Sequence, residues 1–241
     1  KKVVDNVSVT IPTGKITSFI GPNGAGKSTV LSIMSRLLNA DSGEIYLNGE
    51  LQNTVSAAGE LSEPPHYLFL GGDTTSGGEL EYQAHCQIAL ARVYTGTMTA
   101  DDVKAAYQAA SKTSETPNPP SVTLPTADML DVDFSDGTAK DTSETNNTAR
   151  TVGSPAIQDD ADFGKKVAAF NGSYDAYMYP FDDTKYGKMT NAVTIESVFC
   201  YNEVPASGEH DIFSNQQSGG IGLGLENGNL QFYCNINKTA G

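Results

Sequence analysis

Nine consecutive residues near the start of the chain have the types and spacing needed to hold a phosphate group. Residues 21–29 read GPNGAGKST and match the pattern G-x-x-x-x-G-K-[ST] at every fixed position. The three glycines lack a Cβ atom, so the backbone can adopt positive φ and bring its N–H groups close to an anion. An apolar run at 16–20 predicts a buried strand before the loop, and residues 27–38 predict a helix after it. The N-terminus of that helix would face the same anion.

This phosphate-binding loop predicts a nucleotide site with Mg²⁺. Lys27 would reach the β- and γ-phosphates, Ser28 would ligate Mg²⁺, and Thr29 would support the loop. The predicted cofactors are therefore ATP and Mg²⁺. The predicted nucleotide-binding residues are Gly21, Pro22, Asn23, Gly24, Ala25, Gly26, Lys27, Ser28 and Thr29.

Residues 1–50, from KKVVDNVSV to IYLNGE, closely resemble the N-terminal part of the ATPase of an ABC transporter that imports iron siderophores. The resemblance implies an α/β P-loop segment that binds ATP, with the other half of a dimer completing the site. It also implies a membrane permease as partner and a place at the cytoplasmic face of a membrane.

Other parts that this resemblance requires do not follow in the chain. We find no Q-loop, no strand ending in Asp-Glu and no His in the context of the family's switch His. Residues 75–79 (TSGGE), followed by QIALARVY at 87–94, look somewhat like the signature loop and its helix. They follow the phosphate loop too closely to leave room for the missing lobe. Phosphoryl transfer needs several such parts at once, so we expect weak nucleotide binding without hydrolysis.

Composition separates the first 50 residues from the rest. Of the 15 Lys/Arg and 29 Asp/Glu, residues 1–50 hold five and four, which leaves an excess of 15 acidic residues beyond them. Such asymmetry suggests segments of different origin. A chain with a formal net charge of −14 repels phosphate backbones, so we expect no nucleic-acid partner. No apolar run approaches the roughly 20 residues of a membrane span.

From residue 51 on, short strand-like runs recur between Gly, Asn, Asp and Ser turns, which is typical of a β-sandwich. Thr99 is a good N-cap for a short helix that reaches about residue 110. The polar segment 135–162 predicts a long loop. The clearest predicted strands are 44–47, 67–70, 87–94, 129–134, 166–170, 176–179, 193–201, 221–226 and 230–236.

Two parts of this region resemble the jelly-roll sandwich of the laminin-G-like and concanavalin-like family. Residues 51–111, with GGD, IALARVY and VKAAY, resemble its C-terminal half. Residues 122–241, with MLDVDFSDGTAKDTS, VAAFNGSYDAYMYP and IGLGLENGNLQFYCNI, resemble its N-terminal half. Residues 112–121 have the composition of a linker. Either the chain holds the end of one sandwich and the start of another, or both halves form one circularly permuted sandwich. The expected fold is thus mainly β, and the chain resembles a chimera.

The sandwich resemblance makes a non-catalytic binding module our main functional prediction, with a carbohydrate or protein ligand and a secreted or cell-surface location. The alternative is an ATP-binding fragment of an iron-siderophore ABC transporter. Family members sometimes bind calcium, for which Asp73, Asp133 and Asp175 are candidates, although solvated turn carboxylates are the commoner role for such residues. Tyr177 and Tyr179 share one strand face and could stack on a sugar, although sandwich packing is the more frequent role.

The three cysteines do not form a C-x-x-C pair, so they do not indicate a zinc site. Two interpretations remain for them. Cys200 and Cys234 could form a disulfide, or Cys86, Cys200 and Cys234 are buried free thiols in strands, which is the interpretation we favour.

Overall fold

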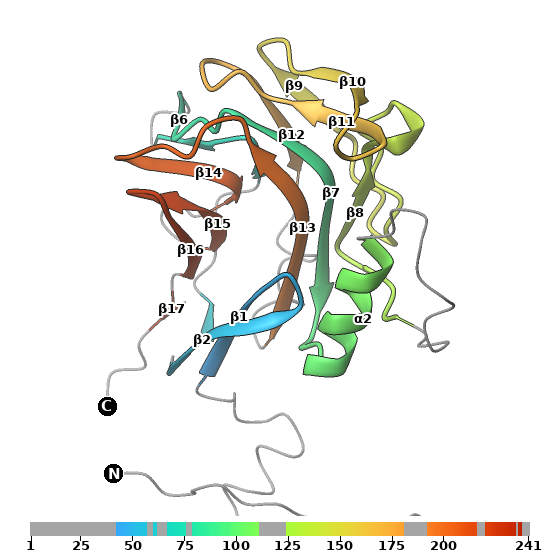
Figure 1. Cartoon of the computed structure of the whole chain (residues 1–241), viewed down its shortest axis with the longest axis vertical. Helices are drawn as coiled ribbons and strands as arrows, with labels where there is room; N and C mark the ends of the chain where they lie inside the picture. The colour runs from blue at the N-terminus through green and yellow to red at the C-terminus, as the bar shows by residue number, and fades with distance from the viewer. Residues whose placement is uncertain are drawn as a thin grey trace, which may run out of the picture. The chain divides into compact units, whose positions relative to one another are not determined.

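The computed structural model describes residues 42–56, 60–61, 67–75, 79–110, 124–180, 192–215, 220–234 and 236–237. The chain divides into two compact units, residues 1–41 and 42–241. The predicted strand at 16–20, the helix at 27–38 and the linker at 112–121 lie outside the described residues. All of the described residues belong to the second unit (Figure 1).

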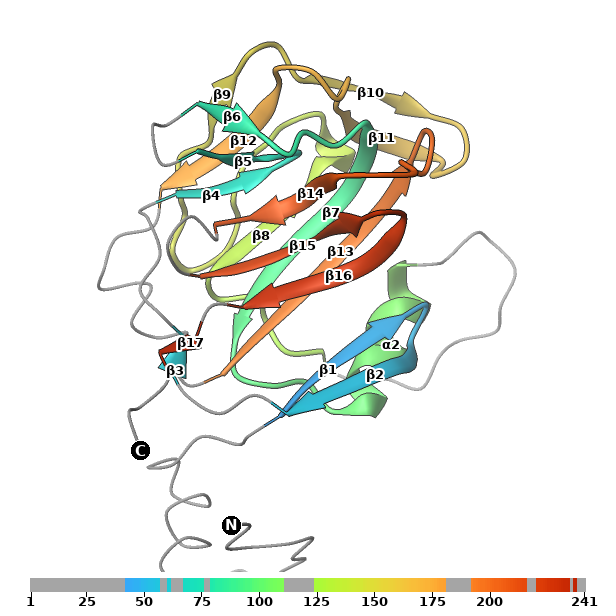
Figure 2. The same ribbon diagram turned by 90° about the vertical axis from the view of Figure 1, so that its left-hand side faces the viewer.

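Two large antiparallel sheets make up most of this unit (Figures 1 and 2). The six-stranded sheet runs in the spatial order β16 (Asn229–Cys234), β15 (Ile221–Glu226), β14 (Glu209–Ser214), β4 (Tyr67–Leu70), β12 (Ala176–Pro180) and β9 (Arg150–Val152). The five-stranded sheet runs in the order β10 (Ala156–Asp160), β11 (Lys165–Ala169), β7 (Cys86–Thr95) and β13 (Val193–Tyr201), with β8 (Leu130–Asp133) also paired to β7.

The hydrophobic core lies between these two sheets, because one cluster of buried side chains draws on both. Leu68, Leu70 and Phe213 come from the six-stranded sheet, and Ile88 and Val132 come from the five-stranded sheet. The mainly β prediction is therefore confirmed, and the arrangement is consistent with a sandwich.

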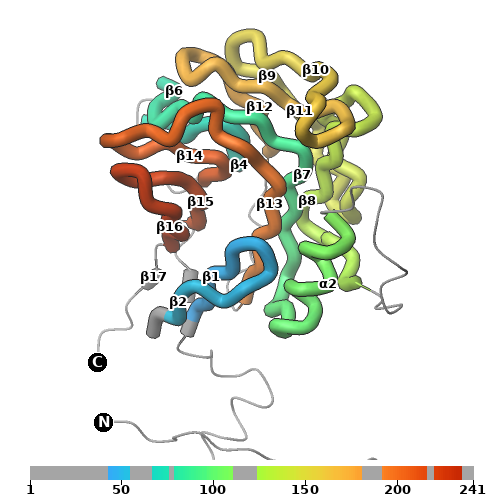
Figure 3. The backbone as a smooth tube through the Cα atoms, in the orientation of Figure 1, coloured from blue at the N-terminus to red at the C-terminus, as the bar shows by residue number. Residues whose placement is uncertain are grey.

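Strands from before and after residues 112–121 pair with each other in both sheets. β4 lies between β12 and β14, and β7 lies between β13 on one side and β8 and β11 on the other (Figure 3). The two parts of the chain thus share one core and do not form two independent sandwiches.

A bulge shapes the long pair between β7 and β13. The register shifts between Val198 and Phe199, and an extra residue of this kind changes which face of a strand points inward. Accordingly, the side chains of β7 that point into the core are Cys86 and Ile88 before the bulge and Ala91 after it. The sequence of β7 is apolar on both faces, so its alternation does not reveal this change.

The remaining elements are small. β1 (Ser42–Leu47) and β2 (Glu50–Ser56) form a hairpin whose two-residue turn, Asn48-Gly49, has φ of 53° and 74°. Positive φ at both positions is what a type I′ turn requires. The other small elements are β3 (Glu60–Leu61) with β17 (Ile236–Asn237), β5 (Asp73–Thr74) with β6 (Leu80–Glu81), the 3₁₀ turn η1 (Phe134–Asp136) and the helix α2 (Ala100–Ala110).

Helix α2 begins as its sequence predicts. The Thr99 hydroxyl accepts the Asp102 backbone N–H at 3.2 Å, and the Asp102 carboxylate accepts the Thr99 N–H at 3.1 Å. This reciprocal arrangement satisfies two backbone donors at the helix start. Within the described ranges, no helix is both long enough and apolar enough to cross a membrane.

The structure also corrects several element predictions. The expected loop at 135–162 contains η1, β9 and β10, and β14 was not predicted. β10 reads AIQDD and is largely exposed, and β14 begins with the polar residues EHD, so neither shows an apolar pattern. β1 begins at Ser42, two residues before the predicted strand at 44–47.

Candidate functional site

The predicted phosphate-binding residues, Gly21 to Thr29, all lie outside the described residues. The assignments of Lys27 to phosphate and of Ser28 to Mg²⁺ therefore remain predictions from sequence. All of the other candidate site residues lie within the described part of the chain.

The three candidate calcium ligands do not form a site. Asp73 is buried, and its Oδ1 accepts the Thr74 N–H at 2.7 Å. Asp175 is also buried, and its Oδ2 accepts the Asn171 N–H at 3.2 Å. Among the residues that the structure describes, no group of three or more His, Cys, Asp or Glu could hold a metal ion. Each of these two carboxylates instead binds a nearby backbone amide.

The third candidate, Asp133, caps the short η1 turn. Its Oδ1 accepts the Ser135 N–H at 2.9 Å, and the Lys165 ammonium lies 3.5 Å from the same oxygen. Partial burial raises the pKa of Asp133, but the Ser135 hydrogen bonds and the Lys165 charge outweigh burial and leave the pKa below its usual range. An ionised carboxylate that is already paired in this way is a structural cap.

Tyr177 and Tyr179 are both buried, so neither ring offers a face to a ligand in solvent. The Tyr177 ring lies 5.7 Å from the Phe134 ring and 6.0 Å from the Phe170 ring. The Tyr179 hydroxyl donates to the Ala139 carbonyl at 2.9 Å. The strand face that these two rings share points into the core, which corrects the predicted role in stacking on a sugar.

A buried carboxylate that the sequence did not single out organises the loop after β8. Asp141 is fully buried, and its oxygens accept the backbone N–H groups of Asp131, Ser143 and Asn147 at 2.7–2.9 Å. They also accept the Asn147 side-chain amide at 2.9 Å and the Thr145 hydroxyl at 3.3 Å. A carboxylate with this many donors is strongly held, which explains why a polar segment has a defined structure.

A row of charged side chains crosses the five-stranded sheet. Arg92 on β7 donates to Asp131 on β8 at 2.8 Å and lies 3.6 Å from Glu196 on β13. Glu196 also accepts the Tyr94 hydroxyl at 2.6 Å. Burial lowers the pKa of Arg92, but the two carboxylates outweigh burial and raise it. Arg92 therefore keeps its proton, and the row ties three strands together.

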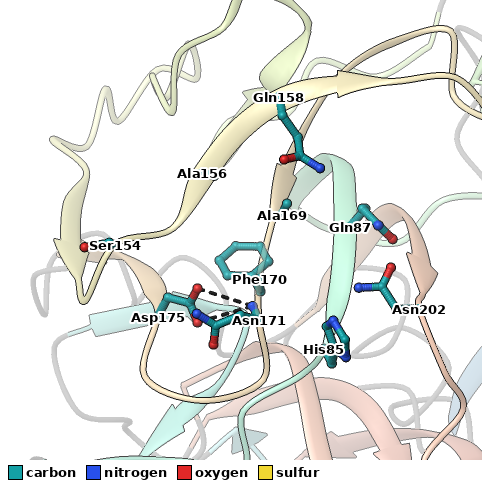
Figure 4. A pocket seen from close by; sticks show the side chains of 10 residues that line it. All are labelled: His85, Gln87, Ser154, Ala156, Gln158, Ala169, Phe170, Asn171, Asp175 and Asn202. Carbon is teal, nitrogen blue, oxygen red and sulfur yellow. Dashed lines mark hydrogen bonds between the residues drawn. The ribbon is translucent and has the colours of Figure 1, made fainter.

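A cavity of about 290 Å³ lies at the end of the five-stranded sheet. Figure 4 shows the side chains that line it. The apolar Phe170 ring forms part of its wall. The polar groups that line it are mainly side-chain amides. Asp175 and Asn171 contribute a turn that joins β11 to β12. The lining residues are His85, Gln87, Ser154, Ala156, Gln158, Ala169, Phe170, Asn171, Asp175 and Asn202. No cysteine, lysine or arginine is among them.

All three cysteines are free thiols, as the favoured interpretation predicted, but Cys200 is exposed and Cys234 is half-buried, so the predicted burial is confirmed for Cys86 alone. Cys86 is buried, and burial raises the pKa of its thiol, so the thiolate is disfavoured.

The segment that resembles a signature helix folds differently in this chain. QIALARVY lies within strand β7, where it pairs with β13 on one side and β8 on the other. Nearly all of its side chains are buried on both faces of the strand. A helix would place these residues in contact with only one neighbouring face, so the surrounding sheets favour the strand.

Residues 4–114 match the ABC transporter family. The match includes the whole phosphate-binding loop and continues through β7 and α2. It covers slightly less than half of the chain. No solved structure matches the chain.

Several similar curated proteins are named as import ATP-binding proteins of bacteria. The petrobactin import ATP-binding protein YclP of Bacillus subtilis is 72% identical over 50 residues, which cover 21% of this chain and 20% of that protein. The iron(3+)-hydroxamate import ATP-binding protein FhuC of the same organism is 48% identical over 54 residues, or 22% and 20% of the two chains. The ribose import ATP-binding protein RbsA of Chromobacterium violaceum is 40% identical over 99 residues, or 34% and 20%.

The chain spans about a fifth of the length of these relatives. The matches contradict our main functional prediction, a non-catalytic laminin-G-like binding module, and favour the alternative of an ABC transporter ATP-binding subunit. They give no support to a carbohydrate ligand, to calcium or to a secreted location. The laminin-G-like resemblance and the chimeric origin have no counterpart among them.

Proposed function

We propose that this chain binds ATP with Mg²⁺ through residues 21–29, as part of the ATP-binding subunit of an ABC transporter. The observation that carries the proposal is the complete GPNGAGKST motif inside a 50-residue stretch that is 72% identical to the petrobactin import protein. A full P-loop pattern in the context of a predicted strand and helix is a specific signal for nucleotide phosphates.

The proposed chemistry follows from the residue types. Backbone N–H groups of the glycine-rich turn and the first turn of the helix at 27–38 would surround the phosphates. Lys27 would neutralise charge on the β- and γ-phosphates. Ser28 would place its hydroxyl on Mg²⁺, and Thr29 would support the loop. The predicted strand at 16–20 would present this loop at its C-terminal end, as an α/β segment does.

We infer the transported substrate and the partner from the same resemblance. Two of the relatives carry names for import of iron complexes, petrobactin and iron(3+)-hydroxamate. We therefore propose a ferric siderophore as the cargo class and a membrane permease as the partner, with the subunit at the cytoplasmic face of the membrane. Binding without turnover remains our expectation for this chain alone, because it lacks a recognisable Walker B strand and switch His.

Titration of the full chain with a fluorescent ATP analogue and Mg²⁺ tests the proposal. We expect saturable binding that is weakened at least tenfold by Lys27→Ala, which corresponds to about 1.4 kcal/mol. Ser28→Ala should weaken binding only while Mg²⁺ is present, because its role is to hold the metal.

The matched control is Lys104→Ala, which removes the same charge from an exposed position on helix α2. This variant should bind like the unchanged chain. Equal affinity of the unchanged chain and Lys27→Ala would refute nucleotide binding through this loop.

A further inference from the structure

Strand β16 ends the six-stranded sheet, and the described residues supply no strand on its outer side (Figure 2). An unpaired edge exposes a row of N–H and C=O groups that can accept another strand. Folded proteins usually prevent this with short strands, charges, proline or bulges. The edges of the two large sheets can therefore be compared for these devices.

Every other edge strand carries at least one of them. β9 has only three residues, one of them Arg150. β10 ends in two aspartates, and β8 has four residues of which two are aspartates. β13 is long, but it contains the charged Glu196.

β16 has none of these features. Its sequence is NLQFYC, with no charge and no proline, and its pairing with β15 runs without a register shift from Asn229 to Cys234. This neutral strand belongs to a unit, residues 42–241, that contains 27 acidic and ten basic residues. Two copies of such a unit repel each other over most surfaces, so an uncharged strip is where they can approach.

The core side of β16 is also incompletely covered. Leu230 and Cys234 face the core by alternation with Phe232, yet all three are only half-buried. Two of their partners on β15, Ile221 and Leu225, are almost completely buried on the same face, and the third, Leu223, is half-buried. One more strand beside β16 would extend this face and remove apolar surface from water.

We infer that β16 is a self-association edge, at which two copies of this chain join their six-stranded sheets by antiparallel pairing of β16 with β16. Alternation limits the register, because core-facing residues must meet core-facing residues. The register centred on Phe232 pairs all three of them: Phe232 lies opposite Phe232 of the other copy, and Leu230 lies opposite Cys234. The arrangement is isologous, so it closes as a dimer and leaves no free β16 edge.

Sedimentation velocity of the full chain, over about a hundredfold range of concentration, measures this association. We expect a dimer that dissociates on dilution. Gln231→Lys should shift the chain to monomer at every concentration tested, because it puts two like charges near the two-fold axis of the paired strands. Gln231→Glu should do the same, and Gln231→Thr, which is uncharged and suits a strand, should keep the dimer.

Gln158→Lys is the matched control, since it makes the same substitution in the middle of the exposed edge strand β10. This variant should dimerise like the unchanged chain, and circular dichroism should show that all variants remain folded. A chain that is monomeric throughout would overturn the inference. So would a dimer that Gln231→Lys and Gln231→Glu leave intact, or one that Gln158→Lys disrupts equally.

Discussion

Two buried aspartates in different regions of the β unit have very different surroundings. Asp141, in the loop between β8 and β9, accepts hydrogen bonds from three backbone amides, one side-chain amide and one hydroxyl. Asp73, at the start of β5, is equally buried, but among the described residues Thr74 is its one backbone donor. Its Oδ2 has no hydrogen-bond partner within the same part of the chain.

The difference shows in the protonation of Asp73. Burial raises its pKa, and the hydrogen bonds from Thr74 and Ser214 only partly oppose this. A charged group removed from water is tolerated when enough donors replace the water, and otherwise it favours its neutral form. The comparison teaches that burial alone does not identify a reactive or metal-binding carboxylate; the number of donors around it must also be known.

Removing the Asp141 carboxylate should have the largest effect. Asp141→Ala leaves several buried N–H groups without an acceptor, each of which costs about 1–3 kcal/mol, so we expect a loss of about 3 kcal/mol or more in the free energy of unfolding. Urea denaturation followed by circular dichroism measures it. Asp136→Ala is the control, because this exposed carboxylate of the same region caps only Thr138, and its loss should stay within about 1 kcal/mol. Similar losses for the two variants would contradict the role of Asp141.

Replacing the carboxylate by an amide should change the free energy of unfolding differently at the two sites. Asp141→Asn replaces one acceptor oxygen by a donor amide that faces other donors, so we expect a loss of about 2 kcal/mol at neutral pH. Asp73→Asn removes a poorly compensated charge and keeps the shape, so we expect no loss or a gain of up to about 1 kcal/mol. The same urea experiment decides this, and a larger loss at Asp73 than at Asp141 would reverse the comparison.

The smallest expected effect is a difference in pH dependence. A carboxyl whose pKa is raised on folding binds protons more tightly in the folded state. Its contribution to stability is therefore fully present below the unfolded pKa of about 3.9 and is lost as pH rises through the folded pKa. Relative to the unchanged chain, Asp73→Asn should gain stability as pH rises above about 4. Unfolding curves at a series of pH values measure this difference, and a difference that stays constant with pH would rule out a raised pKa.

Strands with clear apolar runs could be predicted from sequence. β4, β13 and β15 were predicted with their observed bounds, and β7 within one residue at each end. Helix α2 was predictable because its N-cap is a local signal at Thr99.

Elements without an apolar pattern could not be predicted in this way. β10 is polar and exposed and exists because β11 pairs with it. The role of Asp141 depends on donors up to ten residues away in a loop with no regular pattern. Of the candidate site residues, Tyr177 and Tyr179 were correctly placed on one face, but alternation cannot tell which face is the core. The nucleotide-binding prediction for residues 21–29 rests on the sequence alone, and its motif is a specific one.

The position of β7 has a consequence for how the chain reaches its native state. Its neighbours in the sheet, β8, β11 and β13, all follow residue 123, and its longest pairing joins residues roughly a hundred positions apart. During synthesis, the ribosome therefore completes this apolar strand well before it makes any of those neighbours. Contacts so distant in sequence make formation slow, and a waiting strand with two apolar faces is open to association with other chains. The risk of such association lasts until β13 has been synthesised and can pair with β7.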